Sequence, residues 1–186
     1  MEDDVIEYAG FWVRLWARLI DAIILSPFLI FGFIVFRNNL VITGFYWNYS
    51  IAFLTIFYEV YFFVKFGATI GKNKAHIKVI GMETDAITWW QSIIRNAPDY
   101  FLQMFNFFGG LSALHAINDF SGLNFFSLQK LLTQNRNPVF GLLTGLISLW
   151  FLADGIVFLC NKKKRSLHDI IAGTMVIKGE TRISFK

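Results

Sequence analysis

The sequence predicts an all-α membrane protein, a bundle of four transmembrane helices with small cytoplasmic segments. Hydrophobic residues fill 55% of the 186 positions and the mean hydropathy is +0.51, far from the balance of a soluble domain. Four apolar stretches are each close to the roughly 20 residues that a spanning helix needs. They cover about residues 12–36, 45–66, 97–118 and 138–161. We therefore expect one membrane domain over residues 1–186.

The first predicted span begins with the aromatic residues of a membrane interface, Trp12 and Trp16 among them, and Pro27 is expected to kink it. The third follows an amphipathic stretch that Thr88 can cap and that Pro98 separates from the span. The fourth carries a GxxxG motif at 141–145. This motif permits close packing within the chain or dimerisation.

Short elements are expected between and after the spans. Residues 77–80 alternate in polarity as a strand does, and a second strand covers 174–178, so the two can pair as a ribbon. The loop from 118 to 138 is long enough to include an interfacial helix near 125–132.

Basic residues concentrate between the second and third spans and after the fourth. The positive-inside rule then predicts a multi-pass protein of the plasma membrane (the inner membrane in bacteria), with both termini cytoplasmic. A basic run that abuts a spanning helix is a topology signal and can attract anionic lipid head groups, so we expect the lipid bilayer as a partner and no nucleic acid. The remaining loops hold only Arg37, Lys130 and Arg136.

Enzymatic chemistry is not expected. Cys160 is the single cysteine, which excludes a disulfide within the chain and gives no metal-ligand spacing. No nucleophile stands beside a base in a catalytic pattern. We therefore predict no cofactor and no metal site.

Ionisable residues lie at similar depths in three spans. Counting 1.5 Å per residue from the inner ends places Asp21, Glu59 and Asp154 about 9 to 11 Å into the membrane. These acids are candidate ion or proton ligands, with Arg18, one turn from Asp21, as their charge partner. The alternative is structural: Arg18 and Asp21 form an ion pair that fixes helix packing, and the other acids are protonated or hydrogen-bonded.

Four blocks of the sequence resemble the RDD family of bacterial membrane proteins, which is named for an arginine and two aspartates. They are residues 10–21 (GFWVRLWARLID), 67–72 (GATIGK), 95–96 (RN) and 161–174 (NKKKRSLHDIIAGT). The resemblance covers residues 10–178 and implies family positions at Arg18, Asp21, Gly71, Lys72, Arg95, His168 and Asp169. Either Asp154 or Asp169 can be the second aspartate, and Asp169 fits its block better.

The resemblance implies little about activity, since most members have no assigned function and some are described as sodium or potassium antiporters that exchange protons. Together with the buried acids it leads to monovalent cation/proton exchange as the expected function, with Na⁺, K⁺ or H⁺ as partners. Four helices are few for such a machine, so a homo-oligomer is expected. The alternative is a non-enzymatic adaptor or assembly factor that docks a partner through its basic cytoplasmic face.

Overall fold

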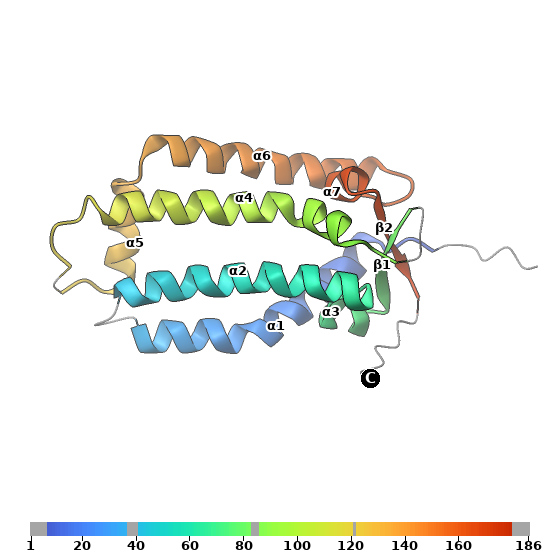
Figure 1. Cartoon of the computed structure of the whole chain (residues 1–186), viewed down its shortest axis with the longest axis horizontal. Coiled ribbons are helices and arrows are strands. Elements are labelled where there is room, and N and C mark those ends of the chain that lie inside the picture. The colour runs from blue at the N-terminus through green and yellow to red at the C-terminus, as the bar shows by residue number, and fades with distance from the viewer. Residues whose placement is uncertain (1–6, 37–40, 83–85, 121, 180–186) are drawn as a thin grey trace, which may run out of the picture. The chain divides into compact units, whose positions relative to one another are not determined.

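The computed structural model describes residues 7–36, 41–82, 86–120 and 122–179 (Figure 1). The described chain is mostly helical and contains one small sheet. Its elements in order are α1 (Phe11–Phe36), α2 (Val41–Phe66), α3 (Ile70–Lys74), β1 (Ile77–Gly81), α4 (Trp89–Leu114), α5 (Phe125–Gln134), α6 (Pro138–Cys160), α7 (Leu167–Ile171) and β2 (Thr174–Lys178).

Three helices are long and apolar enough to cross a membrane: α1, residues 42–66 of α2, and α6. Their large apolar side chains are exposed in the isolated chain, as lipid-facing side chains are, for example Ile23, Leu54 and Leu146. The chain is therefore a multi-pass membrane protein. Helix α4 has 26 residues but is not among the three, because polar residues such as Asp99, Gln103 and Asn106 make it less apolar than the other long helices.

The chain divides into two compact units. Unit 1 consists of residues 1–24, 57–97 and 151–186, and unit 2 of residues 25–56 and 98–150. All four divisions fall inside long helices, and two of them are near Pro27 and Pro98. The predicted turn at Pro98 is wrong, because α4 continues through it: a proline removes one hydrogen bond from a helix but its φ is helical.

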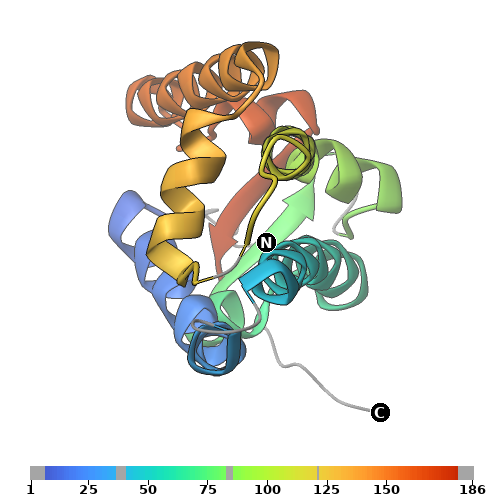
Figure 2. The same cartoon turned by 90° about the vertical axis from the view of Figure 1, so that its left-hand side faces the viewer.

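Unit 1 contains the predicted ribbon, in which β1 and β2 are antiparallel with Val79 opposite Val176 (Figure 2). The chain before α1 extends this pairing, since the Ala9 N–H donates to the Val176 carbonyl at 3.0 Å. A two-stranded ribbon is marginal alone. Here one of its faces is buried in a core with Ala17 and Phe63 of the long helices.

The connection from α2 to β1 depends on a glycine. Gly67 follows the end of α2 with a φ of 71°, a left-handed conformation that glycine adopts without strain. Its N–H donates to the Phe63 carbonyl at 2.9 Å, and its carbonyl accepts from the Val79 N–H at 2.7 Å. Gly67 is therefore hydrogen-bonded both to α2 and to β1. Residues 69–74 lie in the connection between the two elements.

Unit 2 has an aromatic core. Phe45 and Leu128 are almost fully buried there together with Ala113. Helix α5 lies where the sequence predicts an interfacial helix, and Asn124 caps it through a reciprocal pair of hydrogen bonds with Ser127 at 2.9 and 2.8 Å.

Arg136, which the sequence places in a loop, turns its side chain back onto the helices of unit 2. Its Nη2 donates to the Phe105 carbonyl at 3.3 Å, to Asn106 Oδ1 at 3.1 Å and to Thr144 Oγ1 at 2.6 Å. Its Nε is buried without a hydrogen-bond partner, and a Cβ on Gly109 would lie 2.5 Å from it. The glycine therefore makes room for the guanidinium.

The GxxxG motif of α6 makes no such contact. A Cβ added at Gly141 or Gly145 would meet nothing within 4 Å in the described chain. The described part of the chain therefore shows no close helix packing through this motif.

Candidate functional site

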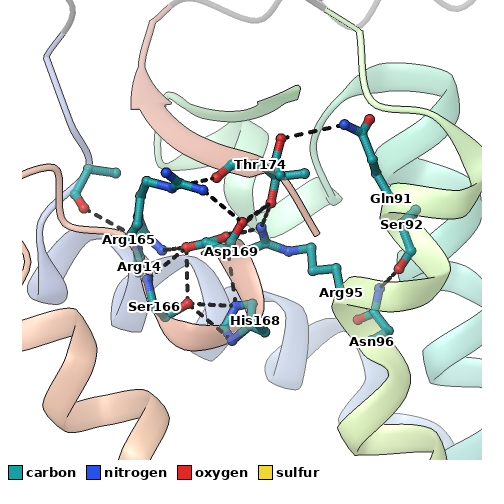
Figure 3. A network of polar contacts seen from close by, with 12 residues as sticks. Arg14, Gln91, Ser92, Arg95, Asn96, Arg165, Ser166, His168, Asp169 and Thr174 are labelled. Atoms are coloured by element: carbon teal, nitrogen blue, oxygen red, sulfur yellow. Dashed lines mark hydrogen bonds and ion pairs between the residues drawn. The ribbon is translucent and has the colours of Figure 1, made fainter. Parts of the chain in front are cut away.

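The most buried acid of unit 1 is Asp169, near the start of α7, with 0% exposure. Two arginines from other helices reach it, as Figure 3 shows. Arg14 of α1 places Nη1 2.8 Å from Oδ2, and Arg95 of α4 pairs with Oδ1. The carboxylate therefore joins α1, α4 and α7 at one point.

Neutral groups complete the shell around Asp169. The N–H and hydroxyl of Ser166 donate to Oδ2 at 3.3 and 3.0 Å. The Thr174 hydroxyl, at the start of β2, accepts from Arg95 at 3.0 Å. Buried polar groups need such partners, and the closing segment of the chain supplies them.

The arginines also bind backbone carbonyls around the network. Arg14 donates to the Lys164 carbonyl at 2.6 Å and to the Ala9 carbonyl at 3.1 Å. Arg165 donates to the Thr174 carbonyl at 3.0 Å. The network thus fixes the start of α1 and the chain from 164 to 174 against each other.

The electrostatics of this site favour an ionised Asp169. Burial alone would raise the pKa of its carboxyl, but the charges of Arg95 and Arg14 hold that pKa well below its ordinary value. Removing one partner of such a buried pair leaves an uncompensated charge. We name these residues, Arg14, Arg95, Ser166, Asp169 and Thr174, the Asp169 network.

Asp154 of α6 is bound by the same segment. Its Oδ1 accepts from the His168 N–H at 2.9 Å and lies 2.8 Å from His168 Nδ1. Burial lowers the pKa of His168 below its ordinary value of 6.5, against the opposing effect of this hydrogen bond. The neutral imidazole must then carry its proton on Nδ1 to donate to the carboxylate.

A second cluster surrounds Asp21. Its carboxylate accepts from the Thr69 hydroxyl at 2.6 Å, the Gly71 N–H at 2.8 Å and the Tyr58 hydroxyl at 3.2 Å. The Tyr58 oxygen in turn accepts from the Ile70 N–H at 3.0 Å. All of these donors are neutral, in contrast to those of Asp169.

The GATIGK block builds this cluster through close approach. A Cβ on Gly71 would lie 2.7 Å from Asp21 Cγ and would press against the Ala17 carbonyl. Only a glycine lets the backbone come near enough for its N–H to reach the carboxylate. Thr69 is fully buried and also accepts from the Lys72 N–H at 3.3 Å, which caps α3.

Lys72 connects the two clusters. It is 8% exposed, and its Nζ lies 4.2 Å from the centre of the Phe63 ring, against which the Arg95 guanidinium also lies at 5.5 Å. Burial lowers the pKa of Lys72 to about 8, although the charges of Glu59 and Asp21 raise it. Lys72 is thus a buried cation that titrates near neutral pH.

The three acids that the sequence singles out fall into two groups in the structure. The charges of Asp21 and Glu59 both act on Lys72, whereas Asp154 binds His168. Arg18 is exposed, and the described contacts of Asp21 come from Tyr58, Thr69 and Gly71 rather than from Arg18. Their roles as ion or proton ligands stay predictions.

Sequence reasoning missed Arg14 as the arginine that enters the network. Arg14, Ala17 and Asp21 are three and seven residues apart, which places them on one helix face. The full burial of Ala17 identifies that face as the inner one. Tyr58 gave no signal, and Thr69 entered only as part of the GATIGK block, because their contacts with Asp21 follow from the rotation of α2 and the fold of residues 67–72.

In the ranges that the structure describes, no three His, Cys, Asp or Glu side chains form a group that could hold a metal ion. Comparison with curated proteins found no match, and neither did comparison with solved structures. The model of the RDD family, in contrast, matches residues 8–173. This match covers most of the chain, including the Asp21 cluster and all of the Asp169 network except Thr174, so the protein belongs to the RDD family.

Proposed function

We propose that this membrane protein exchanges a monovalent cation for protons and that Asp21 binds the cation. The observation that supports this most is the shell of Asp21, in which a carboxylate near the start of an apolar helix has neutral donors only. In the described chain Asp21 forms no ion pair. A carboxylate without a fixed counter-charge in such a position is a functional candidate.

The ligand atoms around Asp21 suit a small hard cation. Besides the carboxylate, the hydroxyl oxygens of Tyr58 and Thr69 lie beside it, one at Oδ1 and the other at Oδ2. Hard cations prefer oxygen ligands, and hydroxyls that donate to the carboxylate can turn their lone pairs to an incoming ion. The site is therefore of the chemistry that binds Na⁺, K⁺ or Li⁺.

Exchange also needs a group that releases a proton when the cation enters. Lys72 is suited to this, because its ammonium is buried close to the charges of Glu59 and Asp21 and its pKa of about 8 is within reach of neutral pH. A cation near these carboxylates would favour loss of the ammonium proton. One positive charge would then replace another.

The proposal includes α4 as a fourth spanning helix, with the plasma membrane as location and the termini in the cytoplasm. Its 26 residues extend about 39 Å, enough to cross the hydrocarbon core. The charge of Arg95 is compensated by Asp169, which lowers the cost of placing that residue at a membrane boundary. A homo-oligomer is the proposed active form.

The test is proton flux in liposomes. The purified protein is reconstituted with an internal pH dye, and gradients of Na⁺, K⁺ or Li⁺ are imposed. Cation-dependent proton movement is expected from the wild type and should be lost in Asp21→Asn, while Glu7→Gln, an exposed acid at the start of the ribbon, should leave it unchanged. Absence of flux from folded wild-type protein would refute the proposal.

A second candidate function is a docking scaffold. It is favoured by the Asp169 network, whose contacts account for its buried charges without any transported ion and hold the basic closing segment in a defined shape. A scaffold would show no cation-dependent flux in the same liposomes. The flux assay therefore separates the two candidates directly.

A further inference from the structure

The cations of unit 1 differ in whether the fold uses them. Arg14 and Arg95 bind Asp169, and Lys178 pairs with Glu7. Lys162 and Lys163, directly after α6, are exposed and form no ion pair within the described part of the chain. Two adjacent positive charges therefore face outward without a counter-charge.

These lysines lie next to the beginning of α1. Arg14 holds the carbonyl of Lys164, the residue that follows them, at 2.6 Å. Two residues before the end of α6, the Phe158 ring lies 6.5 Å from the Phe11 ring and 4.9 Å from the Arg14 guanidinium carbon. Since α1 and α6 are both candidate spans, the lysines are located where two spans reach the same membrane surface.

The first turns of α1 carry exposed tryptophans at this place. Trp12 is 71% exposed and Trp16 is 62% exposed, and their spacing of four residues puts them on one face of the helix. Ile23 continues this face with 68% exposure, so it is turned to the lipid. Tryptophan in such a position is typical of the head-group region, where the indole ring is apolar and its N–H can donate.

We propose that Lys162 and Lys163 bind the head group of an anionic phospholipid at the membrane surface where Trp12 and Trp16 lie in the first turns of α1, and we name these four residues the Trp–Lys surface. The charges are complementary, since ammonium groups and indole N–H groups all favour a phosphate. The nearest acids do not compete, because Asp154 and Asp169 are already bound by His168 and by the arginines. This inference does not depend on ion exchange.

The experiment is native mass spectrometry of the full-length protein released from detergent micelles. Phosphatidylglycerol and phosphatidylcholine are titrated separately, and the affinity of the first bound lipid is compared. We expect preference for phosphatidylglycerol, and about a tenfold weaker affinity for it in Lys162→Gln/Lys163→Gln. The matched control is Lys65→Gln/Lys74→Gln, which removes two exposed lysines elsewhere in unit 1 and should keep the preference.

A second measurement locates the lipid. In vesicles that contain brominated phosphatidylglycerol, tryptophan emission should be quenched more than with brominated phosphatidylcholine. Trp12→Phe/Trp16→Phe should reduce this difference more than Trp89→Phe/Trp90→Phe, which changes two other exposed tryptophans of unit 1. Equal affinity for the two lipids would overturn the proposal. So would an equal loss in the two lysine double variants, because the effect would then follow net charge rather than this surface.

Discussion

The two units stabilise buried and half-buried arginines in different ways. In unit 1, Arg14 and Arg95 share one carboxylate, so that each positive charge depends on Asp169. In unit 2, Arg136 is bound by carbonyl, amide and hydroxyl oxygens, and it forms no ion pair with any residue that the structure describes.

The surroundings of the arginines differ in the same sense. In unit 1, ion pairs connect short segments. In unit 2, aromatic rings pack together: the centre of the Phe107 ring lies 5.3 Å from that of Tyr49 and 6.0 Å from that of Phe45. An ion-paired network fails when one member is lost, because the remaining charges are stranded. A single charge with neutral acceptors strands nothing when it is removed. The units should therefore respond differently to the loss of a charge.

The largest effect is expected for Asp169→Asn. This change leaves Arg14 and Arg95 buried without a counter-charge, and we expect a loss of about 3 to 5 kcal/mol in the free energy of unfolding. Equilibrium unfolding in detergent micelles measures it. Glu7→Gln is the control: it breaks the exposed pair with Lys178 and should cost less than about 1 kcal/mol. Similar losses of unfolding free energy in both variants would show that the buried Asp169 network contributes no more to stability than an exposed ion pair.

A smaller effect is expected for Arg136→Met in unit 2. The variant loses hydrogen bonds but strands no charge, so unfolding should become easier by about 1 to 2 kcal/mol. Arg136→Lys should be the less stable of the two variants, since it keeps the charge but loses the planar set of donors. Equilibrium unfolding in the same micelles shows which of the two variants is less stable. If Arg136→Met were as damaging as Asp169→Asn, the contrast between the units would be broken.

Much of this fold follows from patterns along the chain. Hydropathy locates α1, α2 and α6, and alternation locates the two strands, because a span and a half-buried strand each impose their own period. The continuation of α4 through Pro98 does not follow, since a proline can end or only interrupt a helix and packing decides which.

The candidate site is less predictable than the fold. The depth of Asp21, Glu59 and Asp154 is a matter of counting residues, but their partners depend on how each helix is rotated and on backbone turns. Arg14 rather than Arg18 enters the network, although both are on the same helix one turn apart. The Asp21 shell needs the close approach at Gly71, which only coordinates can reveal.

The smallest predicted effect is a pH dependence from His168. Its folded pKa is below the ordinary 6.5 because burial disfavours the charged imidazole. Between these two values the unfolded chain binds a proton that the folded chain does not, so the contribution of His168 to stability is complete above about pH 6.5 and declines as the pH falls below it. Asp169 adds no dependence in this window, since its contribution is lost only below its ordinary pKa of 3.8.

The measurement is the midpoint of thermal unfolding between pH 7 and pH 5, a window below the pKa of about 8 of Lys72, so that the titration of Lys72 adds little to it. The wild type should lose stability on acidification, and His168→Gln should be flat, because an amide can still donate to Asp154 but does not titrate. His115→Gln, in which the exposed histidine of unit 2 is changed, should behave as the wild type. A wild-type midpoint that rises on acidification would mean that attraction between the protonated imidazole and Asp154 outweighs burial. Unit 1 would then use His168 as a third paired cation, and its contrast with unit 2 would become sharper still.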